Sequence, residues 1–458
     1  MGNETEKSAG RLLSLDVFRG LTIAAMVLVN NPGSWDHIYG PLEHAPWDGW
    51  TPTDFIFPFF LFIVGVAMTF SFDKRLARGD SRAGLFVQVC RRAAILFMLG
   101  MILQSFPNFR LIIPWALIIV GAHFVLADSG KVTRSPIGIA ALTVAVLWLA
   151  LDWAHFSGPN RLSVSDKVGW LQSLWPRGEN LGGSIVRIPG VLQRIAMCYL
   201  AASVIVMYSG IWGRLAWALA LINLYYLIVR HIPAPIDWIA GTSGGGRASA
   251  TAGAPFPGAL HDWIDVKIFG AHLYGGRPDP EGLLSTIPSI ATTLFGVLAG
   301  NWILAKRPRM EIALGMFLVG NAMLIAGWCM DQYFPINKPI WSSSYVVFMT
   351  GWALVILGAC YYFIDVRGSK WWTGPFVVLG TNAILVFFAS GILARLMGMI
   401  RWTTDEKAVS VRSWIYSICT STFPDTPKNA SLAFALFNVV LWLVLTYPLY
   451  RKKIFLKV

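Results

Sequence analysis

The chain has 458 residues, of which 55% are hydrophobic, 14% aromatic and only 13% charged, and its formal net charge is +13. Soluble domains carry roughly 25% charged residues, so this composition excludes a soluble globular domain and makes the lipid bilayer the expected partner. On a soluble protein this net charge would favour nucleic acid as a partner; here it indicates a cytoplasmic face rich in Lys and Arg, and no nucleic acid is expected.

Apolar stretches follow one another along the whole chain. A helix needs about 20 largely apolar residues to cross the hydrocarbon layer. We therefore predict an all-α, polytopic membrane helix bundle with about 12 transmembrane helices. Their predicted ranges are 13–30, 54–72, 89–105, 111–126, 137–151, 191–208, 212–229, 284–304, 312–330, 345–363, 376–396 and 432–450.

The distribution of basic residues predicts the orientation of these spans. Placing both termini in the cytoplasm assigns most of the 37 Lys and Arg residues to short inner turns, whereas the first outer loop, 31–53, contains none. This bias predicts that both termini are cytoplasmic. The segment 230–283 becomes a long outer loop with a glycine-rich run, and such loops often act as functional lids. Since no internal repeat is visible, we expect residues 1–458 to form a single transmembrane domain.

The first outer loop carries the densest group of titratable side chains. It contains His37 and His44 together with several acids, and the second span begins at Asp54. A histidine beside a carboxylate suits general acid–base chemistry. The pattern alone nevertheless favours a surface histidine over a catalytic one at position 44, and a helix N-cap at Asp54.

A few polar or small residues inside the predicted spans need an explanation. Arg194 lies just inside a span, where an ionisable group is either functional or extends to the interface. Asp16 and Arg19 have the spacing of a pair on one helix face, and Gly296 and Gly300 have the spacing of a helix-packing motif. No P-loop, serine-hydrolase or zinc-protease motif is present, and no metal is expected.

Nine short blocks, all in the same order, resemble the heparan-α-glucosaminide N-acetyltransferase family of transmembrane acetyltransferases. They include SLDVFRG at 14–20, the HAPW of 44–47 with Asp54, RIPGVLQR at 187–194 and YRKKIF at 450–455. The remaining blocks are 29–30, 272–274, 279–290, 337–346 and 382–386. Each block alone is weak, but their number and order are specific.

The resemblance implies an acyltransferase that moves acetyl from acetyl-CoA to the amine of an amino sugar such as glucosamine. His44 matches the family's active-site histidine and would act as the base or as an acetyl carrier. Asn30 matches an asparagine that the family also needs, and could donate to the oxyanion; Asp54 could orient the imidazole. The residues implied to bind substrate or CoA are Arg19, Arg187, Gln193, Arg194, Asp279, Glu281, Asn337, Lys338, Trp341, Ser342 and Asn382.

The chain also departs from the lysosomal members of that family. Those have a luminal domain and a further span before the first block, whereas this chain begins close to the block and has an additional apolar pair within 111–151. It thus resembles the prokaryotic branch, for which we expect a bacterial inner membrane and a free amino sugar as acceptor. An amino-sugar transporter or permease and an O-acetyltransferase of a surface glycan remain alternatives, and the sequence is compatible with a homodimer.

Overall fold

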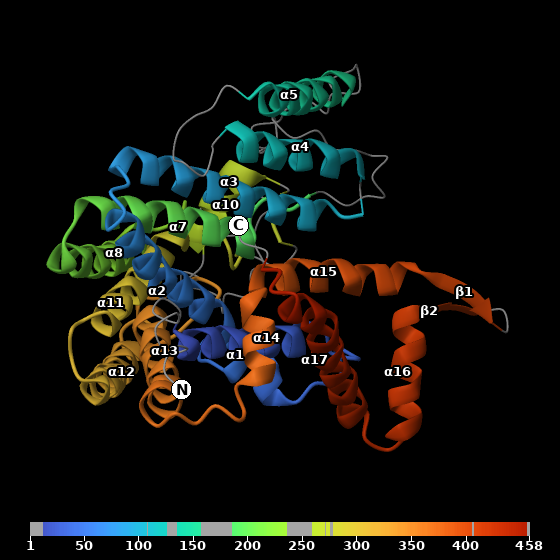
Figure 1. The fold of residues 1–458 in the computed structure, drawn as a ribbon. Helices are drawn as coiled ribbons and strands as arrows, with labels where there is room; N and C mark the ends of the chain where they lie inside the picture. Colours follow the sequence, from blue (N-terminus) through green and yellow to red (C-terminus); the bar gives the residue numbers. More distant parts are fainter. Residues whose placement is uncertain are drawn as a thin grey trace.

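The computed structural model describes residues 12–107, 109–125, 135–156, 186–235, 259–270, 272–274, 278–404 and 407–455. Within these residues the protein is a bundle of helices (Figure 1). One antiparallel hairpin is the exception, formed by β1 (Arg401–Thr404) and β2 (Lys407–Ser410). The predicted all-α class is confirmed in its main feature, since the described residues are mostly helical and this hairpin is their only sheet.

The helices follow the predicted apolar stretches closely. Their bounds are α1 Leu13–Asn30, α2 Ile56–Leu76, α3 Arg82–Ser105, α4 Phe109–Val125, α5 Pro136–Phe156, α7 Val191–Tyr208, α8 Ile211–His231, α10 Ala259–Phe269, α11 Thr286–Ile303, α12 Arg309–Asp331, α13 Ser343–Tyr361, α14 Gly374–Thr381, α15 Ala383–Met399, α16 Val411–Thr422 and α17 Pro427–Arg451. Three short helical turns, η1 (Gly40–Leu42), η2 (Pro52–Phe55) and η3 (Tyr362–Val366), complete the helical elements of the described chain.

The predicted number of 12 spans is not confirmed. Among the described residues nine helices are long and apolar enough to cross a membrane, or ten if the bent pair α14 and α15 forms one span. At the stretches 111–126 and 137–151 the parts whose side chains are described, Ile112–Val125 and Pro136–Trp148, are apolar helices of fewer than 18 residues. The stretch 376–396 is broken at Asn382, where the two helices meet at 80° and the backbone leaves the helical region. The orientation of the termini stays a prediction.

Close packing in the centre of the bundle depends on small residues. A Cβ at Gly296 would lie 2.1 Å from the Phe62 carbonyl oxygen, and one at Gly65 would lie 2.0 Å from that of Thr293. A Cβ at Gly300 would meet Thr69 at 2.8 Å. The spacing of Gly296 and Gly300 is thus confirmed as a packing motif that brings α11 onto α2.

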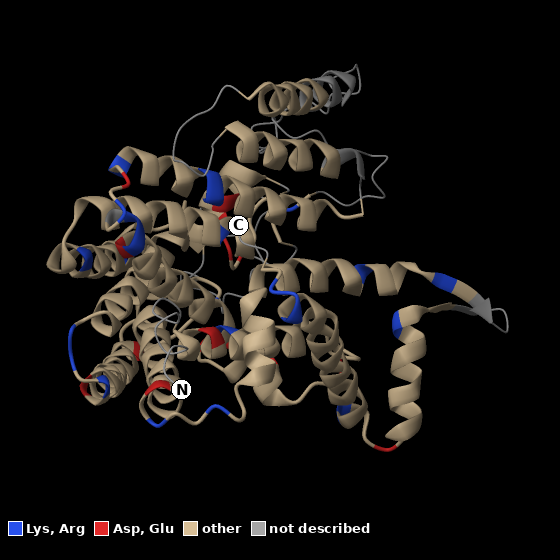
Figure 2. Ribbon diagram, in the orientation of Figure 1, with Lys and Arg blue, Asp and Glu red and all other residues tan. Residues whose placement is uncertain are grey.

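Burial separates interior helices from peripheral ones. In the apolar windows of α11 and α13, 72% and 67% of the residues are buried, but only 17% and 28% in those of α8 and α12. Figure 2 shows that most of the described ribbon carries no charged residue, which fits apolar outer faces in lipid.

The long segment 230–283 is only partly described. Its described part includes α10, which packs its Leu260 into an apolar cluster with Leu284 at the start of the next span. The glycine-rich run at 241–246 lies outside the described residues. The outer location of this segment and the single-domain assignment stay predictions.

Candidate active site

His44 and Asp54 form a direct pair at the entrance to α2. The ring Nδ1 lies 2.7 Å from Asp54 Oδ1, and the His44 side chain is 53% exposed while the Asp54 side chain is 1% exposed. When Nδ1 carries the proton and donates it to this buried carboxylate, Nε2 keeps its lone pair and can accept a proton.

Lys338 completes this group, which we call the acid–base cluster. Its Nζ lies 2.9 Å from His44 Nδ1, 3.2 Å from Nε2 and 3.4 Å from Asp54 Oδ1. Burial lowers the pKa of Lys338 below its ordinary value, while the charges of Asp54 and Glu281 act in the opposite direction. The sequence indicated Lys338 as a CoA ligand, and the structure places its amine beside the imidazole.

Local hydrogen bonds hold Asp54 in place. Thr51 and Asp54 form a capping box at η2, and the backbone N–H groups of Ala45 and Thr51 donate to Asp54 Oδ2 at 3.1 and 3.0 Å. The Tyr345 hydroxyl, from α13, donates to the Asp54 carbonyl oxygen at 2.6 Å. The predicted N-cap role of Asp54 is therefore wrong: Thr51 is the N-cap of η2 and Asp54 is the N3 residue of the capping box, whose carboxylate also binds the imidazole.

The loop between α12 and α13 brings Lys338 to this point. Asn337 pairs with Asp48 as an isolated bridge, and its side-chain amide donates to Asp48 Oδ1 at 3.1 Å. Ser342 caps α13, and its hydroxyl accepts from the Asn337 N–H at 3.0 Å. Both residues are buried. Asn337 and Ser342, expected to bind substrate, thus shape the loop that carries Lys338.

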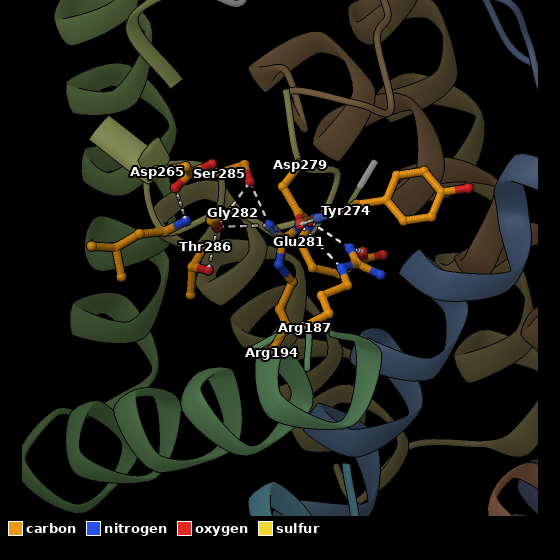
Figure 3. Close-up of polar contacts among 10 residues, drawn as sticks. Arg187, Arg194, Asp265, Tyr274, Asp279, Glu281, Gly282, Ser285 and Thr286 are labelled. Carbon is orange, nitrogen blue, oxygen red and sulfur yellow. Dashed lines mark hydrogen bonds and ion pairs between the residues drawn. The ribbon is translucent and has the colours of Figure 1, made fainter. Parts of the chain in front are cut away.

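A second group, the arginine cluster, consists of Arg187, Arg194, Asp279 and Glu281 (Figure 3). The Arg187 Nε donates to Asp279 Oδ2 at 3.0 Å, and its Nη2 binds both Asp279 and Glu281. The guanidinium also lies over the Tyr274 ring, 4.8 Å from its centroid. Although burial alone would lower it, the charges of Glu281 and Asp279 hold the pKa of Arg187 above its ordinary value.

Arg194 is fully buried and only partly bonded. Its Nη2 donates to the Gly282 carbonyl oxygen at 2.9 Å and to the Ser285 hydroxyl. Among the described residues its Nε and Nη1 have no hydrogen-bond partner. A buried guanidinium with unused N–H groups is unusual and indicates a ligand position.

Trp341 connects the two clusters. Its ring lies 5.2 Å from the Arg194 guanidinium carbon and packs edge-on against Phe57 of α2, with the ring centroids 4.9 Å apart. Its backbone has a φ of 54°, which is rare for a bulky residue, and its side chain is buried. A strained residue held between two polar clusters is a common feature of functional sites.

Sequence reasoning missed the polar face of α10. His261, Asp262 and Asp265 are all buried, and Asp265 Oδ1 accepts from the Leu283 N–H at 2.9 Å, next to the Gly282 carbonyl that binds Arg194 (Figure 3). Burial raises the pKa of Asp265 to about 7; Asp279 and Asp262 also raise it, and the Leu283 N–H and Arg194 oppose them. The i, i+4 spacing of His261 and Asp265 was the available signal.

We expect Asp265→Asn to stabilise the protein more at pH 8 than at pH 5. The pKa of the Asp265 carboxyl is about 7 in the folded protein, whereas the ordinary pKa of an Asp side chain is 3.8. The unfolded chain therefore loses this proton first, and wild-type stability falls as pH rises from 3.8 to about 7. Asparagine keeps an acceptor for Leu283 and does not titrate.

Thermal unfolding of the two proteins in detergent at both pH values measures this difference. Asp425→Asn, which removes a carboxylate at an exposed position, is the matched control for the change in net charge. A stability gap for Asp265→Asn of the same size at pH 5 and pH 8 would contradict the buried, proton-holding carboxyl.

The remaining predicted residues lie elsewhere on the bundle. Asn30 is the exposed last residue of α1, and no hydrogen bond joins it to His44 within the described part of the chain. Gln193 is buried and contacts Met101, 3.6 Å from Nε2 to Sδ. The Arg19 guanidinium lies 3.5 Å from the Asp16 carboxylate, as the spacing predicted. Along the axis of α1, Arg19 is about 16 Å from Asn30. Asn382 donates to the Ile454 carbonyl oxygen at the α14–α15 break.

Comparison with known proteins points to the family that the sequence blocks indicated. The family described as "Heparan-alpha-glucosaminide N-acetyltransferase, catalytic" matches residues 11–127, which include His44 and Asp54. Two curated proteins named heparan-alpha-glucosaminide N-acetyltransferase are similar: the Mus musculus protein is 25% identical over 99% of this chain, and the Homo sapiens protein is 27% identical over 98%. The chain spans 62% and 60% of their lengths. The family resemblance inferred from the sequence blocks is confirmed.

Proposed function

We propose that this chain, which is related at the family level to the heparan-alpha-glucosaminide N-acetyltransferases, is a membrane-embedded acetyltransferase. It would transfer acetyl from acetyl-CoA to the amine of a glucosamine-like amino sugar. The observation that supports this most directly is the acid–base cluster, where a half-exposed imidazole lies 2.7 Å from a buried carboxylate. Such a pair is suited to accept a proton from the nitrogen of the amine that attacks the thioester.

In the direct route the acceptor ammonium first loses one proton to solvent, and the neutral amine then attacks the thioester carbonyl while its nitrogen gives a second proton to His44 Nε2. The C–N bond forms, the C–S bond breaks, and the leaving CoA thiolate takes up the proton from the imidazolium. In the covalent route Nε2 itself attacks the thioester, the thiolate leaves, and the amine then takes the acetyl group from the imidazole. In both routes Asp54 holds Nδ1–H and stabilises the charged ring.

Two cations are placed to serve the donor. The Lys338 amine, 3.2 Å from His44 Nε2, lies where the tetrahedral oxyanion would develop its charge. Arg194, which contacts Trp341, has Nε and Nη1 without a hydrogen-bond partner among the described residues, and they could bind an oxygen of the CoA moiety. Asn30 remains a second candidate donor to the oxyanion. On the predicted orientation, the acid–base cluster faces outside and acetyl-CoA arrives from the cytoplasm.

Acetyl transfer by the purified protein tests this proposal. Detergent-solubilised protein is mixed with acetyl-labelled acetyl-CoA and a panel of amines that begins with glucosamine, and products are read by mass spectrometry. We expect CoA release and a labelled amide. A carrier would consume no acetyl-CoA, and an alkali-labile ester product would indicate O-acetylation of a hydroxyl; either result contradicts the proposal.

Omitting the acceptor separates the two routes. In a single-turnover experiment, label that stays on the protein supports the acetyl-histidine intermediate. If no label is retained while glucosamine is still acetylated, the direct route is supported. A His44→Ala sample run in parallel shows whether retained label depends on the imidazole.

A further inference from the structure

An apolar groove of about 980 Å³ lies in the wall of the bundle between α8 and α12. Residues of α11 and α13, such as Leu298 and Val347, form its floor. Figure 1 shows α11 between α8 and α12. Leu219, Leu318 and Val319 line the groove and are 44%, 62% and 53% exposed, so it is open along the faces that meet lipid.

The groove is long as well as apolar. On α12 its lining runs from Gly315 to Met330, which is about 23 Å along a helix axis. That length approaches the roughly 30 Å of the hydrocarbon layer. A free sugar has no part that fits such a groove, whereas an extended hydrocarbon tail does.

One end of the groove lies at the loop that carries Lys338. Phe334 and Ser343 line this end and flank the loop that carries Lys338. Phe334 and Ile340 of the same loop share an apolar cluster with Trp47, three residues after His44. A tail lying in the groove would therefore direct its head group toward His44.

We propose that this groove holds the hydrocarbon tail of a lipid-linked amine, and that such an amphiphile is the acceptor. This inference rests on the proposed acetyltransferase function. The tail lies along α12 with its far end near Gly315 and Trp302, and the amino head group emerges beside the Lys338 loop. The groove thus selects the acceptor by its tail, and the acid–base cluster acts on its amine.

A groove-filling variant tests the acceptor class. Ala326 is exposed and lines the groove, whereas its neighbour Ile325 is 67% exposed and does not. In phosphatidylcholine nanodiscs, Ala326→Trp should lower the ratio of kcat/KM for dodecyl glucosaminide to that for free glucosamine by about tenfold, because several buried CH₂ groups lose their site. Ile325→Trp should keep the wild-type ratio, which controls for partitioning into the bilayer. An unchanged ratio in Ala326→Trp, with glucosamine still acetylated, overturns the groove and leaves the proposed function standing.

A binding measurement covers the case in which neither acceptor is acetylated, which would refute the proposed function. Dodecyl glucosaminide with a diazirine at its tail end is photolysed in the nanodiscs, and labelled peptides are mapped by mass spectrometry. We expect label on the groove-lining parts of α8 and α12, and its loss in Ala326→Trp but not in Ile325→Trp. Label spread equally over other lipid-facing helices such as α17 overturns the inference, because bulk phospholipid would then fill the groove.

Discussion

Replacing His44 by alanine is expected to lower kcat/KM for acetyl transfer by about 10²- to 10⁴-fold, the usual contribution of a positioned acid–base group. The fold should persist because the side chain is 53% exposed. The buried Asp54 carboxylate also keeps a cation in the variant, since Lys338 Nζ is 3.4 Å away. Turnover of labelled acetyl-CoA with glucosamine measures the loss, and the thermal transition in detergent measures stability.

His37 provides the matched control. It is exposed in the same loop, so His37→Ala should keep both activity and stability. Adding imidazole to the His44→Ala protein should restore part of the turnover if the missing group is a base or an acetyl carrier. Activity of His44→Ala within twofold of wild type would remove the imidazole from the mechanism.

Replacing Arg187 by methionine is expected to lower stability by about 3–5 kcal/mol, the range for breaking a buried ion pair from one side. The side chains of Asp279 and Glu281 are 0% and 9% exposed, and both bind this guanidinium. Without it, the two buried carboxylates would lose the cation that they share, although the backbone N–H groups of Tyr274 and Glu281 would still donate to Asp279. A large drop in the thermal transition in detergent should follow, together with loss of acetyl transfer because Arg194 is held by the same segment.

An exposed ion pair on the same protein shows how much less stability is lost when an arginine is removed from the surface. Arg307 and Glu311 lie 3.7 Å apart, with side chains 52% and 55% exposed, so Arg307→Met should cost only about 0–1 kcal/mol. Neutralising both acids in the Arg187→Met background, by Asp279→Asn and Glu281→Gln, should recover part of the stability. Equal effects of Arg187→Met and Arg307→Met would show that the arginine cluster adds no more than a surface pair.

Several features of the fold were predictable because they depend on local sequence. Apolar length located α1, α2 and α13, and the Gly296 spacing predicted close packing. The break at Asn382 was not predictable, since an apolar stretch of the right length conceals a bend of 80°. Apolar composition could not reveal the hairpin after α15 either, because hydropathy reports burial and not the backbone path.

Some residues of the candidate site could be predicted from the sequence and others could not. His44 and Asp54 are ten residues apart in one loop, so their proximity could be proposed from spacing and from the family resemblance. The position of Lys338 could not, because it lies 294 residues from His44 along the chain. The acidic face of α10 was also missed, because its residues lie inside a segment that composition describes only as a loop.

By itself, the sequence determined that this protein is made of lipid-embedded helices, where most of them lie, which family it resembles and which histidine to examine. Hydropathy and motif order are properties of consecutive residues, so they need no knowledge of packing. Only the tertiary structure decided that Lys338 lies beside His44, that Arg187 binds Asp279 and Glu281, and that a groove between α8 and α12 ends at the loop that carries Lys338. These contacts join segments far apart in the chain, and they depend on how closely the glycine-bearing faces of the helices pack.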